Sequence, residues 1–296
     1  MKEGGRGASG SAPLLVVFAA ISFQTGSALA VKVVESVGVV EAAWLRNAIG
    51  ALLLASFTVA WRRESLRLPP RGSRLTLAGL TLSILAMNLG FYGAIQYAPV
   101  GVVVAIVFLG PLAVAVAGTR RRVDWLWIAL AGAGVALLAG PTSSVSPLGL
   151  LLALAAGASF AIYLVLGKRV VTGLAPLTTA TLMLCGAALL LTPLLAVGGL
   201  SIAGHGGVIA LAAVVALLSA ALPFVLEFTA LRRVRVATYG VLICIEPAIA
   251  AVAGFVVLGQ RLSISEIVAI GAVTIGAVGA SWTSGPSGSA IDVPVA

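Results

Sequence analysis

Long apolar runs, separated by short groups of charged residues, proline or glycine, form the hydropathy pattern of this chain. A helix needs about 20 apolar residues to cross a bilayer, whereas a barrel strand needs about 10 in strict alternation. The runs are of the longer kind, and the connections between them are too short to form a soluble domain. The pattern predicts ten transmembrane helices, over residues 13–34, 39–60, 75–95, 99–118, 124–141, 147–166, 176–198, 207–231, 236–258 and 263–283.

The two halves of the chain repeat each other at a constant offset, and positions related by this offset are called equivalent below. The same offset separates the members of five identical pairs, which are Lys32 and Lys168, Gly50 and Gly186, Ser83 and Ser219, Pro111 and Pro247, and Gly118 and Gly254. Duplicated apolar halves are typical of transporters, because alternating access needs two halves that can move about a central site. We expect five-helix repeats over residues 13–141 and 147–283, with disordered cytoplasmic tails over 1–12 and 284–296.

Composition places the chain in a membrane, and charge gives its orientation. Only 9% of the residues are charged, against about 25% in a soluble domain, and 60% are hydrophobic. The formal net charge is +9, which could indicate a nucleic-acid partner. However, 15 of the 18 Lys and Arg residues fall on one side of the predicted topology if the N-terminus is cytoplasmic. We therefore predict a membrane topology signal, both termini in the cytoplasm, and no nucleic-acid partner.

Three ionisable side chains lie inside predicted spans, where an unpaired charge is costly. Glu246 is near the middle of the ninth span and precedes Pro247, which frees a backbone carbonyl one turn earlier. A buried carboxyl favours its neutral form, so Glu246 could bind and release a proton. Arg46 could hold a substrate carboxylate, or only neutralise a glutamate such as Glu246. Glu227 could couple to protons, or it could reach the interface and pair with Arg232.

These charges are not duplicated. The positions equivalent to Glu246, Glu227 and Arg46 hold Gly110, Phe91 and Leu182. A duplicated backbone with an asymmetric polar centre suits a substrate with two distinct ends, such as an amino acid. Neutral polar side chains within the spans could line a cavity or could only join helices, and they are Gln24, Thr25, Asn88, Ser159, Tyr163 and Ser219. Of these, the candidates for substrate contact are Gln24, Asn88, Tyr163 and Ser219.

Other features define smaller expectations. Pro111 and Pro247 occupy equivalent positions and are candidate hinges. Cysteine and histidine are too few and too scattered for a metal site, and motifs for catalysis or nucleotide binding are missing. We therefore expect no enzyme activity, no metal and no cofactor. Small residues repeat every four positions in two spans and could form a homodimer face or pack within the chain, namely Gly132, Ala136 and Gly140, and Ala272, Gly276 and Ala280.

Several stretches in both halves resemble the drug/metabolite transporter superfamily in its EamA-type, ten-helix branch, and within it the bacterial threonine/homoserine exporters. They are residues 110–115 (GPLAVA), 157–163 (GASFAIY), 218–227 (LSAALPFVLE) and 246–252 (EPAIAAV). The resemblance covers nearly the whole chain. One departure is Gly259-Gln260, where the family usually has Gly-Glu.

The resemblance implies two inverted five-helix repeats around a central cavity in the bacterial inner membrane. It implies export of small amino acids or related metabolites, by exchange for protons, and it draws attention to Arg46, Glu227 and Glu246. The alternative is an uncoupled facilitator, or an exporter of another metabolite or a drug.

Overall fold

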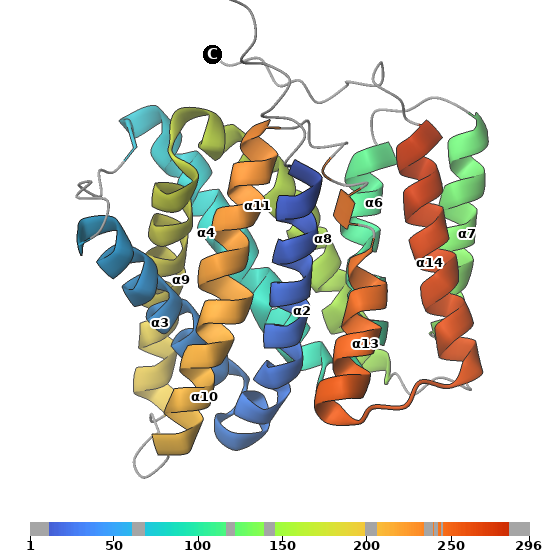
Figure 1. Cartoon of the computed structure of the whole chain (residues 1–296), viewed down its shortest axis with the longest axis horizontal. Helices are drawn as coiled ribbons and strands as arrows, with labels where there is room; N and C mark the ends of the chain where they lie inside the picture. Colours follow the sequence, from blue (N-terminus) through green and yellow to red (C-terminus); the bar gives the residue numbers. More distant parts are fainter. Residues whose placement is uncertain are drawn as a thin grey trace, which may run out of the picture.

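Helices are the only regular secondary structure in the part of the chain that the computed structural model describes, which comprises residues 12–60, 69–116, 122–138, 146–198, 206–233, 239, 242–243 and 245–283 (Figure 1). The predicted tails lie outside these residues, except for Ala12. In chain order the helices are α2 (Ala12–Val37), α3 (Val39–Ala60), α4 (Arg71–Ala94), α5 (Val100–Val107), α6 (Leu109–Val116), α7 (Arg122–Leu138), α8 (Pro147–Gly173), α9 (Pro176–Gly198), α10 (Gly206–Ala216), the π-helical turn η1 (Leu217–Ala221), α11 (Leu222–Arg233), α13 (Glu246–Leu258) and α14 (Ile264–Thr283).

Six helices within the described residues are long and apolar enough to cross a membrane. They are α2, α3, α4, α8, α9 and the continuous helix formed by α10, η1 and α11. Shorter apolar helices occupy the other four predicted spans, at Val100–Val114, Trp125–Leu137, Glu246–Leu258 and Ile264–Gly276. The all-helical prediction is confirmed for the described residues, while the number of ten spans stays a prediction.

Helices from the two halves of the chain pack against each other. α4 packs on α8 and α2 on α11, while α3 contacts α9, α5 contacts α13, and α7 contacts α14. Figure 1 shows the α7–α14 pair at one side of the molecule and α3 with α9 at the other. If each helix is replaced by its equivalent in the other half, the α4–α8 pair becomes the α2–α11 pair, and the α3–α9 and α7–α14 pairs are unchanged. The buried core consequently lies between the halves.

Two of the predicted spans are interrupted close to their prolines. The span expected over residues 99–118 divides at Phe108 into α5 and α6. Pro111 lies in the first turn of α6 and cannot donate a hydrogen bond to the carbonyl of Val107. Likewise, α13 starts only at Glu246, with Pro247 in its first turn, where proline is favourable. Both prolines therefore lie where a described helix begins, and their role as hinges stays a prediction.

Glycines let helices of the two halves approach each other closely. A Cβ atom on Gly157 of α8 would lie 2.8 Å from the carbonyl oxygen of Val107, and one on Gly110 of α6 would meet the carbonyl of Gly157. At the α7–α14 contact, a Cβ on Gly276 would lie 2.7 Å from the carbonyl oxygen of Trp127. Gly276 therefore serves packing within the chain, and the homodimer stays a prediction.

One end of α13 is tied to the start of α5. Gly259, with φ of 65°, ends α13 in the left-handed conformation that favours glycine. The Gln260 backbone N–H donates to the carbonyl oxygen of Gly254 (3.2 Å). Its side-chain oxygen accepts a hydrogen bond from the Val100 backbone N–H (3.2 Å). Gln260 thus caps a helix of the first half, at the position where relatives were expected to carry an acid.

Side-chain caps fix the starts of two further helices. Ser146 precedes α8, and its hydroxyl accepts a hydrogen bond from the Gly149 N–H at 3.1 Å. Ser263 and Glu266 form a reciprocal capping box before α14. The Glu266 carboxylate accepts from the Ser263 N–H at 2.8 Å, and the Ser263 hydroxyl accepts from the Glu266 N–H at 3.3 Å. Glu266 is therefore a buried acid with a local structural role.

Candidate functional site

A cavity of about 680 Å³, its open mouth included, lies between helices of both halves. Most of the wall is apolar and aromatic, with a minority of polar side chains. The polar groups and tyrosines that line it are Gln24, Ser27, Arg46, Asn88, Tyr92, Tyr163, Glu227, Tyr239 and Glu246.

Most of the residues predicted from the sequence come together in this cavity. The six that line it are Gln24, Arg46, Asn88, Tyr163, Glu227 and Glu246. The seventh, Ser219, is absent from the lining and instead contacts Arg46. Pro111 and Pro247 are also absent from the lining and lie at the helix breaks described above. Six of the seven predicted polar residues therefore line one cavity, and their roles stay predictions.

Arg46 on α3 is held by Ser219 and two aromatic rings. It is one of the largest fully buried side chains of the described residues, with 2% exposure. Its Nε donates to the Ser219 hydroxyl (2.9 Å) and its Nη2 to the Ser219 carbonyl oxygen. The guanidinium carbon lies 5.7 Å from the ring centre of Phe23 and 5.3 Å from that of Phe224. The alternative that Arg46 pairs with Glu246 is therefore wrong.

Glu246 is instead joined to Gln24. Its Oε2 accepts a hydrogen bond from Gln24 Nε2 at 2.8 Å, which links the first residue of α13 to the middle of α2. An acid in the first turn of a helix also interacts favourably with the helix dipole. Proline at the next position favours a helix start here, which leaves the Glu246 carboxyl at the end of a helix. The packing of α13 then brings this carboxyl to the cavity.

Glu227 on α11 lies deeper than the sequence suggested. The residue is 8% exposed and lines the cavity, next to Tyr163 and Tyr239. Arg232, the alternative partner near the end of the helix, is exposed. The pairing and interface alternatives for Glu227 are therefore wrong, and its carboxyl faces the same space as Arg46 and Glu246.

Several buried polar atoms of the lining have no hydrogen-bond partner within the described residues. Four of them are donors or hydroxyls, and two are acceptors. They are Arg46 Nη1, Asn88 Nδ2, Tyr92 OH, Tyr163 OH, Gln24 Oε1 and Glu227 Oε1. Buried polar groups are nearly always satisfied in folded proteins, and leaving one unsatisfied is costly. The cavity can therefore offer hydrogen bonds of both kinds, and both signs of charge, to a polar ligand.

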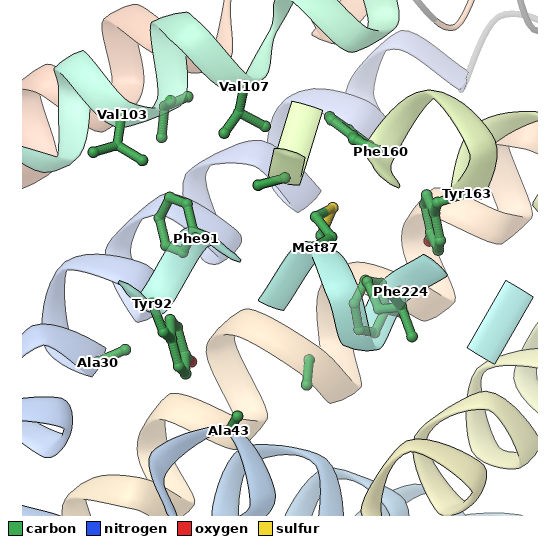
Figure 2. Close-up of a cluster of buried hydrophobic side chains, with 14 of the residues drawn as sticks. Ala30, Ala43, Met87, Phe91, Tyr92, Val103, Val107, Phe160, Tyr163 and Phe224 are labelled. Atoms are coloured by element: carbon green, nitrogen blue, oxygen red, sulfur yellow. The ribbon is translucent and has the colours of Figure 1, made fainter. Parts of the chain in front are cut away.

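Sequence reasoning missed Tyr92, Tyr239 and the aromatic wall. The ring centres of Phe160 and Tyr163 are 6.0 Å apart and those of Tyr163 and Phe224 6.1 Å apart, and both pairs are tilted. Figure 2 shows Phe160, Tyr163 and Phe224 grouped around Met87, with Tyr92 on the same helix as Met87. Helical spacing could have found part of this wall, because Asn88 and Tyr92, and also Phe160 and Tyr163, are four and three residues apart on one helix face.

Comparisons with known proteins agree with this architecture. The profile of the EamA-like transporter family matches residues 147–282. The threonine/homoserine exporters RhtA of Escherichia coli (strain K12) and Salmonella typhimurium (strain LT2) are each 39% identical over 275 residues, which cover 92% of this chain and 92% of theirs. A solved crystal structure of another protein superposes with a TM-score of 0.68 at 18% identity, over 94% of this chain and 99% of its own. That structure shares the fold.

Proposed function

The chain belongs to the EamA-like transporter family, and on this premise we propose that it exports threonine, homoserine or a similarly small amino acid from the cell. It is a multi-pass membrane transporter and not an enzyme. The names of the RhtA relatives support the substrate class, and the chemistry of the cavity supports it independently.

The observation that carries the proposal is the pairing of opposite charges with unsatisfied atoms in one cavity. Arg46 Nη1 and Asn88 Nδ2 are free donors, which suit a carboxylate. Glu227 Oε1 and Gln24 Oε1 are free acceptors, which suit an ammonium group. A zwitterionic amino acid presents both groups on one carbon atom. The free tyrosine hydroxyls can serve the side-chain hydroxyl that threonine and homoserine share.

We propose that the same charges provide exchange for protons. The lining holds one cation, Arg46, and two acids, Glu227 and Glu246, so the cavity carries one net negative charge when both acids are ionised. A zwitterion leaves this charge unchanged, whereas a proton neutralises it. The substrate ammonium and the proton therefore compete for the same carboxylates, and this competition is the requirement for antiport. Glu246 is the proposed main proton carrier, with Glu227 assisting it.

Orientation and symmetry complete the proposal. The excess of Lys and Arg on one side supports cytoplasmic termini in the bacterial inner membrane. The constant offset between the halves, together with helix pairs that persist on their exchange, supports two inverted five-helix repeats. In this orientation the Gln260–Val100 hydrogen bond lies at the outer end. There a Cβ on Gly101 would also lie 2.8 Å from the Cα of Ala251. Export requires this contact between the halves to open.

Ligand-induced stabilisation of the purified protein tests the proposal. A ligand that binds the folded state at 100 times its Kd stabilises it by about 2.7 kcal/mol, which raises the Tm. Threonine and homoserine should raise the Tm, while threonine amide, which lacks the carboxylate, and N-acetylthreonine, which lacks the ammonium, should not. Tm shifts with threonine amide and N-acetylthreonine as large as the shift with threonine would refute two-ended recognition. A shift only with an unrelated metabolite would support the alternative substrate class.

A further inference from the structure

The π-helical turn η1 interrupts the helix formed by α10 and α11 beside the cavity. A π-turn widens the helix and makes backbone carbonyls available to outside donors, and such turns are frequent at functional sites. Here the Leu218 carbonyl oxygen accepts from the Ser22 hydroxyl at 2.7 Å. The Ser219 carbonyl oxygen accepts from Arg46 Nη2. Both donors come from the first half of the chain, so the turn joins the two halves.

Ser219 occupies one defined edge of the Arg46 guanidinium. Nε and Nη2 together form the side edge of the planar group, and they donate to the hydroxyl and the carbonyl of this single residue. The rings of Phe23 and Phe224 lie near the guanidinium, at 5.7 and 5.3 Å. The other edge is the end edge, formed by Nη1 and Nη2, and its buried Nη1 has no hydrogen-bond partner within the described residues. This edge is suited to two parallel hydrogen bonds with a carboxylate.

A glycine on α2 makes this arrangement possible. A Cβ atom on Gly26 would lie 2.7 Å from the Ser219 backbone nitrogen and 2.8 Å from the Ser219 Cβ. Real side chains do not approach a backbone so closely, so any larger residue at position 26 would push the π-turn away from α2. The position of Ser219 therefore depends on Gly26.

The equivalent positions in the other half lack this device. Ser83, the equivalent of Ser219, donates its hydroxyl to the Leu80 carbonyl within α4 (2.8 Å), and α4 runs unbroken. Leu182, the equivalent of Arg46, carries no charge. The π-turn and its arginine therefore occur together in one of the two equivalent places only. Duplication of the scaffold alone does not account for them.

We propose that η1, through Ser219, is the positioning element that directs the end edge of Arg46 toward the substrate carboxylate. This inference rests on the proposed function. Ser219 then acts through Arg46 and does not touch the substrate, which differs from the substrate-binding role predicted from the sequence. The consequence is a defined orientation of the amino acid in the cavity, with its carboxylate on the α3 side and its ammonium toward the acids.

Kinetics of Ser219→Ala in inside-out vesicles test this role, with Ser83→Ala as the matched control. Removing one hydrogen bond to a charged group should raise the KM for threonine by about 10-fold, with Vmax changed less than about 2-fold. Ser83→Ala should retain the wild-type KM. Arg46→Lys removes the side edge of the guanidinium. In this background, Ser219→Ala should raise the KM for threonine by less than about 2-fold more, because the two residues act as one unit.

Gly26→Ala tests the positioning role of Ser219 independently, with Gly271→Ala as its control. Within the described residues, no atom beyond the chain neighbours and local helix backbone lies within 4 Å of a Cβ built on Gly271, so that variant should transport as the wild type does. Gly26→Ala should raise the KM as Ser219→Ala does. This variant still tests the positioning role if the Ser219→Ala protein fails to reach the membrane.

The outcomes separate the inference from the proposed function. Absence of threonine transport by the wild-type protein would refute the proposed function itself. Transport by the wild type, with the same KM in Ser219→Ala and Ser83→Ala, would overturn the positioning role and leave the function standing. A rise in the KM that persists undiminished in the Arg46→Lys background would overturn it as well, since Ser219 would then act independently of Arg46.

Discussion

Replacing Glu246 with glutamine should uncouple transport from the proton gradient without unfolding the protein. The change preserves the size of the side chain and the acceptor for Gln24 Nε2, which donates to Glu246 at 2.8 Å. A hydrogen bond to a charged group contributes about 1.5–3 kcal/mol and a neutral one about 0.5–1.5, so the stability loss should be about 1 kcal/mol. The remaining ionisable groups of the lining, Arg46 and Glu227, then balance in charge, as in the protonated wild type.

The assay compares two modes of transport in inside-out vesicles. Exchange of labelled for unlabelled threonine should continue in Glu246→Gln, because Glu227 Oε1 and Gln24 Oε1, the acceptors proposed for the substrate ammonium, remain in the variant. Uptake driven by an acidic lumen should fall to the level seen without a gradient. Glu266→Gln is the matched control, since this buried acid lies outside the cavity lining and glutamine also fits a capping box. Full gradient-driven uptake by Glu246→Gln would refute the reasoning.

Two further variants test the contacts between the halves. Gly110→Ala should lower stability by about 3 kcal/mol, because the new Cβ would meet a backbone carbonyl of α8, whereas Gly132→Ala has open space and should not lower the Tm. Equal Tm values for the two would contradict the packing. Gln260→Ala removes the hydrogen bond that caps α5. Loss of this bond should destabilise the outward-closed state by about 1 kcal/mol, so labelling from outside of a cysteine substituted for Ser27 should rise about fivefold. Gln96→Ala, at an exposed glutamine, is its control, and equal labelling would contradict the outer closure.

The sequence predicts the helices and the polar centre for simple physical reasons. Apolar runs of span length have few alternatives to helices in a bilayer, so the element type follows from length and composition. A charged residue within such a run must face protein or water, which is why Arg46, Glu227 and Glu246 could be selected without a structure. All three line the same cavity.

The partners of these residues could not be predicted in the same way. Gln24 and Glu246 are 222 residues apart in sequence, and Arg46 and Ser219 are 173 apart. Their contacts depend on how distant helices pack, and hydropathy contains no such information. The π-turn is equally invisible, because residues 217–221 (LLSAA) are ordinary helix-compatible residues in an apolar run. For the same reason the sequence assigned Ser219 to the substrate, whereas its hydroxyl binds the arginine.

Uptake of labelled threonine and homoserine into inside-out vesicles, with and without an acidic lumen, tests the central claim most directly. The account predicts uptake that an acidic lumen stimulates, that an uncoupler abolishes, and that is absent from vesicles without the protein. Uptake that is indifferent to the gradient and to the uncoupler would contradict proton exchange and identify a facilitator. No uptake of either amino acid above that of vesicles lacking the protein would contradict the amino-acid assignment itself.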